Sequence, residues 1–109
     1  MKKEIINNTL SIMIDGTEVR TKEQLLTIMK EALSFPDYFG MNWDALDECI
    51  KDLSWLKEID LIEILITNSI QILSLASEKD KTIFHSIMNT TVDYWTNTGT
   101  RLVLFIRYK

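Results

Sequence analysis

Several residue types that carry chemistry are scarce in this sequence. Its 109 residues include one cysteine, one histidine and three glycines. One cysteine cannot form a disulfide within the chain, which excludes a small scaffold held together by disulfides. The single histidine, His85, is the only candidate base for Ser–His–Asp or Cys–His catalysis, and we expect it to be an ordinary surface residue. Three glycines do not make a glycine-rich phosphate loop.

Long apolar runs and targeting segments are also missing. No run approaches the roughly 20 apolar residues of a membrane-spanning helix. The N-terminus is basic, but Glu4, Asn7 and Asn8 interrupt any apolar core of a signal peptide. We therefore expect a cytoplasmic protein without a membrane partner. Apolar residues make up 46% of the chain and charged residues 26%, which predicts one globular domain over residues 1–109.

The charge is concentrated in one stretch. The chain has 16 acidic and 12 basic residues, a net charge of −4. Residues 35–53 contain five acids and one base, so this stretch alone carries the whole excess; its acids are Asp37, Asp44, Asp47, Glu48 and Asp52. With no basic patch, direct binding to nucleic acid is not expected, whereas a basic protein partner would be attracted. The ordinary alternative is a solvated helix face with acids near its N-terminus.

The same stretch reads as a loop followed by a short helix. Gly40 permits a positive φ, and Asn42 can cap a helix that begins near Trp43. Apolar residues then recur at the spacing of a buried helical stripe, at Leu46, Cys49, Ile50 and Leu53. We expect Cys49 to be a small buried residue and not a nucleophile. Trp43 and Trp55 fit either the edge of the core or a contact surface.

Strands and helices alternate along the rest of the chain. The capping box Thr21-x-x-Gln24 opens a helix that ends before Pro36. We predict strands at residues 10–14, 61–67 and 101–108, and further helices at residues 68–76 and 78–97, with Gly99 as the stop of the last helix. Strands separated by helical segments imply parallel pairing.

Residues 35–50 carry a family resemblance. They read Phe-Pro-Asp-Tyr-Phe-Gly-Met-Asn-Trp-Asp-Ala-Leu-Asp-Glu-Cys-Ile, which closely resembles the signature segment of barstar-like proteins, intracellular inhibitors of secreted microbial ribonucleases. The resemblance implies an α/β fold, with a small three-stranded parallel sheet in the order 1-2-3 packed against about four helices. Residues 1–9 are additional to the family pattern and would either fray or add an edge strand.

The resemblance also implies a function. The chain would inhibit a basic ribonuclease or a related toxin nuclease as a monomer in a 1:1 complex, with no cofactor and no catalysis of its own. The acidic helix and the aromatic loop before it would block the active site. The family's contact positions fall on Tyr38, Gly40, Asn42, Asp44, Asp47 and Glu48. A further acidic contact on the last helix aligns near Asp93 or Tyr94. The best-known member has Trp and Asp at the positions of Asp47 and Glu48.

Two other functions are compatible with these residues. The acidic face could bind a basic partner that is not a ribonuclease, as an immunity protein, antitoxin or interaction module. Alternatively, Asp44, Asp47 and Glu48 have the i, i+3, i+4 spacing that could share one Mg²⁺. A single exposed helix supplies no enclosing ligands and no adjacent base, so we expect neither a metal nor an enzyme.

Overall fold

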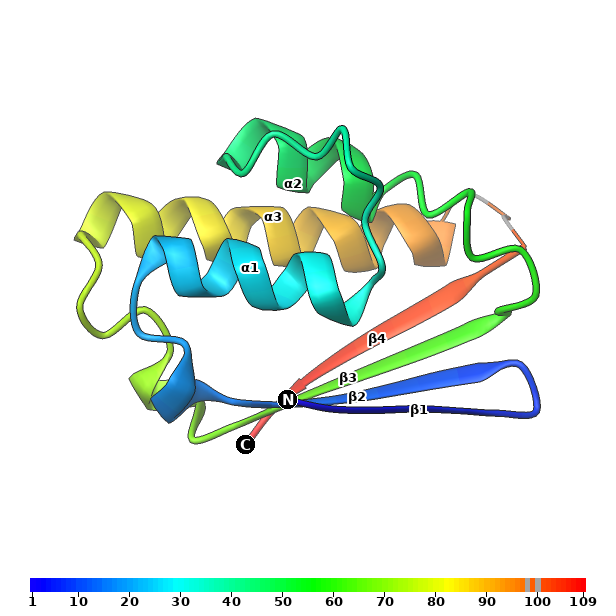
Figure 1. The fold of residues 1–109 in the computed structure, drawn as a ribbon, viewed down its shortest axis with the longest axis horizontal. Coiled ribbons are helices and arrows are strands. Elements are labelled where there is room, and N and C mark those ends of the chain that lie inside the picture. Colours follow the sequence, from blue (N-terminus) through cyan, green and yellow to red (C-terminus); the bar gives the residue numbers. More distant parts are fainter. Residues whose placement is uncertain (98, 100) are drawn as a thin grey trace.

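The computed structural model describes residues 1–97, 99 and 101–109, which form a sheet with helices packed on one of its faces (Figure 1). The described residues include four strands, three α-helices and two short 3-10 helices. In chain order these are β1 (Lys2–Ile6), β2 (Thr9–Asp15), η1 (Gly16–Glu18), α1 (Lys22–Ala32), α2 (Trp43–Ile50), β3 (Leu61–Thr67), η2 (Ser69–Gln71), α3 (Glu78–Asn97) and β4 (Val103–Tyr108).

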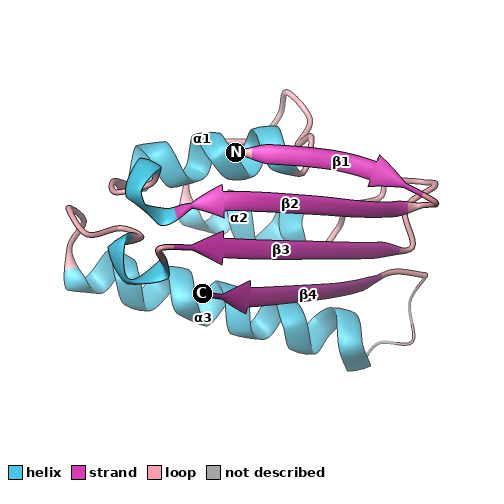
Figure 2. Cartoon of the chain, turned by 90° about the horizontal axis from the view of Figure 1, so that it is seen from below, coloured by secondary structure: helices cyan, strands magenta, loops and turns pink. Residues whose placement is uncertain are grey.

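The strands lie in the order β1-β2-β3-β4 (Figure 2). β2, β3 and β4 pair in parallel, as the helical segments between them predicted, whereas β1 pairs antiparallel to β2. The predicted three-stranded sheet in the order 1-2-3 is therefore correct for β2, β3 and β4, but the sheet has a fourth strand. Parallel neighbours need a crossover, and α1 with α2 and then α3 supply the two crossovers.

The fourth strand comes from the N-terminal extension. β1 and β2 are joined by Asn7 and Asn8, whose φ angles are 50° and 65°. A two-residue hairpin turn of this kind needs positive φ at both central residues, and asparagine tolerates that conformation better than most residues do. The extension therefore adds an edge strand.

The predicted helix over residues 68–76 is wrong, which lowers the number of α-helices in the described residues from about four to three. Only Ser69–Gln71 coils, as a 3-10 turn. Beyond it, the backbone N–H of Leu73 donates to the carbonyl of Val19 at 2.8 Å, and that of Leu75 to Arg20 at 2.9 Å. These bonds to another segment replace the i→i−4 bonds that a helix would require.

The core lies between the helices and one face of the sheet. Alternate residues of each strand point into it, so that Leu10, Ile62 and Leu104 lie abreast and are almost fully buried. Phe84 of α3 is also fully buried. The opposite face of the sheet carries no helix of the described chain (Figures 1 and 2). None of the described helices has the length and apolar character needed to cross a membrane.

The ends of α1 follow the sequence closely. Thr21 Oγ1 accepts from the Gln24 N–H at 3.1 Å, and Gln24 Oε1 accepts from the Thr21 N–H at 3.2 Å, which confirms the capping box. At the other end Ser34 adopts a φ of 54°, and the Phe35 N–H donates to the Lys30 carbonyl at 3.0 Å. This closing pattern ends α1 before Pro36 and sends the chain into the aromatic loop.

Candidate functional site

The loop before α2 is anchored by aromatic side chains. Phe35 and Phe39 are buried with their ring centroids 4.8 Å apart, and the Trp55 ring meets Phe35 edge-on at 5.9 Å. The indole N–H of Trp55 donates to the Leu33 carbonyl at 2.9 Å. These contacts hold the loop from beneath, while the Tyr38 side chain remains 71% exposed. An exposed tyrosine on a fixed loop is a typical anchor for a protein partner.

The start of α2 is fixed by Asn42. Its Oδ1 accepts from the Ala45 N–H at 2.8 Å, which confirms the predicted N-cap, and its Nδ2 donates to the Gly40 carbonyl at 3.1 Å. The positive φ expected at Gly40 is found instead at Met41, with a value of 51°. A Cβ at position 40 would lie 3.2 Å from Asn42 Nδ2, so a side chain there would press on the capping amide.

The inner side of α2 is buried as predicted, with Leu46 and Ile50 fully inaccessible and Cys49 nearly so. Leu53 is also fully buried, but it lies beyond the end of α2 and has a φ of 50°. Burial, followed by the nearby carboxylates, raises the pKa of the Cys49 thiol. The thiol is therefore protonated at neutral pH and is a poor nucleophile.

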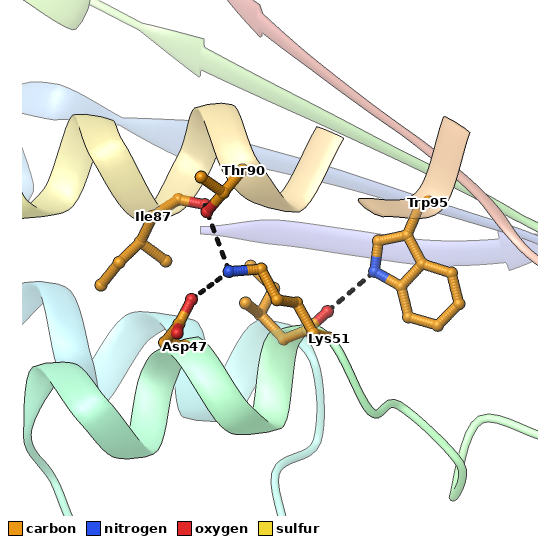
Figure 3. Close-up of polar contacts among 6 residues, drawn as sticks. Asp47, Lys51, Ile87, Thr90 and Trp95 are labelled. Carbon is orange, nitrogen blue, oxygen red and sulfur yellow. Dashed lines mark hydrogen bonds and ion pairs between the residues drawn. The ribbon is translucent and has the colours of Figure 1, made fainter. Parts of the chain in front are cut away.

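Two indole N–H groups hold α2 against α3. At its start, Trp43 Nε1 donates to Asp80 Oδ1 at 2.9 Å. At its end, Trp95 Nε1 donates to the Ile50 carbonyl at 2.9 Å (Figure 3). Because Trp43 is only 8% exposed, it belongs to the edge of the core. α2 is thus held at both ends, and its outer side chains project from a fixed backbone.

The acidic side chains of α2 fall into two groups. Asp47 forms an ion pair with Lys51, and Lys51 Nζ also donates to Thr90 Oγ1 of α3 at 2.8 Å (Figure 3). Asp47 is therefore partly neutralised and drawn toward α3. Asp44 and Glu48 are exposed, and neither forms an ion pair with any residue that the structure describes. These two carboxylates are the ones available to an external cation.

Most of the predicted contact residues line one hollow beside the start of α2. Its lining includes Tyr38, Gly40, Asn42, Asp44 and Glu48, together with Lys22, Trp43, Ala45 and Ile83. Asp47 is not part of this lining. Lys22, which the sequence did not single out, comes from α1 and places its Nζ 5.6 Å from the centre of the Trp43 ring. Its position depends on how α1 packs against α2, for which the sequence carries no signal.

The hollow lies within the part of the chain that a known family covers. The family described as Barstar (barnase inhibitor) matches residues 9–107. The chain belongs to the barstar family. The match begins at β2 and includes every residue of the hollow, whereas β1 lies outside it.

A relative of this barstar-family chain has been named in Bacillus subtilis (strain 168). The relative, called "Putative ribonuclease inhibitor YrdF", is 46% identical over 39 residues. That match covers 36% of this chain and 43% of the relative, so it spans less than half of the relative's length.

The Tyr38 hydroxyl keeps its proton at neutral pH. Desolvation raises its pKa, and the Asp52 carboxylate adds to the effect. Asp93 and Tyr94, the positions near the family's further acidic contact, are both exposed on α3 but do not line the hollow. Among the residues that the structure describes, no three His, Cys, Asp or Glu side chains are grouped so that they could hold a metal ion.

Proposed function

We propose that this chain inhibits a basic ribonuclease by covering its active site with the outer side of α2 and the loop before it. A ribonuclease active site uses cationic side chains to bind the phosphates of RNA. Carboxylates held on a protein surface can occupy the same positions, and opposite charge also speeds the encounter. The inhibitor needs no chemistry of its own, because occlusion of the site is sufficient.

The observation that supports this proposal most strongly is the pair Asp44 and Glu48. Both carboxylates are exposed, lack an ion pair among the described residues, and line one hollow with Tyr38. This hollow lies in the part of the chain matched by the barnase inhibitor family. We assign Asp44 and Glu48 to cationic subsites and Tyr38 to an aromatic contact, with Gly40 and Asn42 fixing the loop. Asp47 has a smaller role, since Lys51 already neutralises it.

We further propose that the inhibitor acts in the cytoplasm, where it would protect a cell from a ribonuclease made for secretion. Through the same surface, the chain would act as an immunity protein against a toxin nuclease. Both cases share the chemistry of a basic active site, and they differ only in how the nuclease is delivered. Each chain would bind one nuclease through its single acidic helix.

The test is inhibition of RNA hydrolysis by barnase, and by other basic microbial ribonucleases, at increasing concentrations of the chain. The wild type should inhibit at least one of these enzymes with one-to-one stoichiometry. The double variant Asp44→Asn with Glu48→Gln should inhibit at least a hundredfold more weakly. A control, Glu18→Gln with Glu58→Gln, removes the same formal charge from exposed positions outside the hollow and should inhibit like the wild type.

Rate measurements add a second criterion. Association should slow about tenfold or more between low salt and 0.5 M salt, while dissociation changes much less, because screening acts mainly on long-range attraction. Full inhibition by the double variant would exclude the outer side of α2 as the inhibitory surface. If the chain inhibits no ribonuclease but binds a different basic protein through Asp44 and Glu48, the function is that of an interaction module.

A further inference from the structure

The face of the sheet opposite the helices is uncovered. Figure 2 views the molecule from this side, with the four strands in front of the helices. Parallel sheets usually have both faces buried, because their crossovers place helices on them. Here the described helices all lie on one side, and the other face exposes 41% of Met13 and 51% of Phe105. Such a face is expected to be covered by another molecule.

The strand register arranges this face in rows that cross the strands. One row runs from Glu4 through Ser11 and Glu63 to Phe105. The next row runs from Lys2 through Met13 and Leu65 to Arg107. One row therefore carries two acids and its neighbour two bases, with apolar side chains among them. Together the rows surround a hollow on the surface of the sheet.

The four charged side chains of these rows are unpaired in the single chain. Within residues 1–97, 99 and 101–109, the ion pairs are Lys51 with Asp47 and Lys81 with Glu78, neither of which involves this face. The acidic and basic side chains of these rows can all form ion pairs with a partner surface that has the same rows in reverse order. A surface of one sign would repel one of the two rows.

We propose that the occupant of this face is a second copy of the chain. A two-fold axis that lies parallel to the rows and between them turns each copy so that its acidic row covers the basic row of the other. Glu4 then meets Lys2 of the second copy, and Glu63 comes within reach of its Arg107. Phe105 stacks against the same Arg107, and Met13 and Leu65 form the apolar centre. The strands of the two sheets are aligned, which is a common packing of sheet on sheet.

The proposed dimer uses the strand that lies outside the family match. β1 provides Lys2 and Glu4, half of the four charged residues in the two rows, and widens the sheet from three strands to four. Four strands at the usual spacing give a face about 19 Å wide, and six residues of strand give about 20 Å in length. Two such faces cover about 760 Å² together, below the roughly 1,200–2,000 Å² of stable specific interfaces, so the dimer should be weak and dependent on concentration.

This arrangement leaves the inhibitory surface free. The outer side of α2 lies on the helical layer, and the dimer forms through the opposite face of the sheet (Figure 1). Each copy in a dimer could then bind its own nuclease. The proposal replaces the expectation of a monomer from the sequence with that of a monomer in reversible equilibrium with a dimer.

Sedimentation velocity from about 1 to 500 µM, at low salt, tests the proposal. The average mass should rise with concentration from 12.7 kDa toward twice that value. Glu63→Arg and Arg107→Glu should each weaken self-association by about tenfold or more, since each places like charges opposite one another. Glu23→Arg, an exposed position on α1, is the matched control and should associate like the wild type.

The decisive experiment mixes the two charge-reversal variants, Glu63→Arg and Arg107→Glu. In a heterodimer of Glu63→Arg with Arg107→Glu, both contacts regain opposite charges, so the mixture should associate more strongly than either variant does alone. Circular dichroism should show that both variants fold. A wild type that remains at 12.7 kDa over the whole range overturns the proposal, as does a mixture that fails to associate. Association that all three substitutions leave unchanged would place the dimer contact elsewhere and overturn it too.

Discussion

On the inner side of α2, Leu46 and Ile50 are fully buried, whereas on the outer side Asp44 and Glu48 are exposed and unpaired among the described residues. The outer carboxylates are four residues apart and repel each other, at a cost of roughly 0.2–0.5 kcal/mol. The apolar inner side and the two indole hydrogen bonds outweigh that cost. The fold and the proposed binding function therefore use different side chains of one short helix, so they can be altered separately.

The largest effect on the inner side should come from Leu46→Ala. Removing this side chain leaves a cavity in a packed core, so the free energy of unfolding should fall by about 2–5 kcal/mol, as measured by urea denaturation. The fraction that remains folded should bind a target ribonuclease as tightly as the wild type. A loss of stability below about 1 kcal/mol would mean that α2 is not held by its inner side.

On the outer side, Glu48→Gln should have an effect of similar size on binding alone. The carboxylate would be desolvated against a cationic subsite, so its loss should weaken binding by about 2–5 kcal/mol, a range to which the barnase–barstar complex of this same family has contributed. The free energy of unfolding should change by no more than about 0.5 kcal/mol. Calorimetric titration with the inhibited ribonuclease measures the first quantity and urea denaturation the second. Unchanged affinity would remove Glu48 from the binding surface.

A further test of the buried core concerns Thr91 of α3. Its hydroxyl is fully buried and has no hydrogen-bond partner among the described residues. Thr91→Val keeps the shape and removes the unsatisfied group, so stability should rise by about 1 kcal/mol. The neighbouring Thr90→Val is the matched control: it removes hydrogen bonds to Lys51 and to the Ile87 carbonyl and should lower stability. Equal changes in the melting temperatures of the two variants would contradict this account.

Asp47→Asn tests whether the two groups of acids on α2 differ. Because Lys51 already pairs with Asp47, the change should weaken ribonuclease binding by less than about 1 kcal/mol, well below the effect of Glu48→Gln. Loss of the pair should lower the free energy of unfolding by about 0.3–0.5 kcal/mol. If Asp47→Asn weakens binding as strongly as Glu48→Gln, Lys51 must release Asp47 in the complex.

The smallest expected effect concerns Asp15, whose carboxylate accepts hydrogen bonds within the folded chain. Hydrogen bonds from the Asn68 side chain, and then from Thr17, lower the pKa of Asp15. Its ionised form therefore stabilises the folded state at neutral pH, and this contribution is lost as the pH falls through the lowered pKa. The difference in unfolding free energy between wild type and Asp15→Asn should be largest near pH 7 and shrink below about pH 4. A difference that does not change between neutral and acidic pH would contradict this account.

The features that the sequence predicted correctly depend on neighbouring residues. The capping box at Thr21 and the N-cap at Asn42 each involve residues three apart, and the buried residues Leu46, Cys49 and Ile50 repeat along a single helix. Five of the six predicted contact residues share one hollow because they occupy one loop and one outer face of α2, and their contact with a partner stays a prediction. Local patterns of this kind are visible without knowledge of tertiary packing.

The features that the sequence did not predict depend on contacts between distant segments. The expected helix over residues 68–76 does not form, since its backbone instead bonds to residues 19–20. Lys22 reaches Trp43 only because α1 packs beside α2, and Lys51 links Asp47 to Thr90 of α3. For residues 1–9 the family resemblance left fraying and an added edge strand open, although a local signal favoured the strand. The adjacent asparagines at the β1–β2 turn are typical of a two-residue hairpin.

That hairpin has a consequence for the order in which the chain folds. β2 meets β3 only after a crossover of more than forty residues, and such distant pairings form slowly because a long loop must close first. β1 reaches β2 through two residues and can pair with it in about 1–10 µs. During the search for β3, one edge of β2 is therefore already occupied and closed to other chains. By pairing early with β2, β1 would protect that edge from intermolecular pairing while the parallel sheet forms.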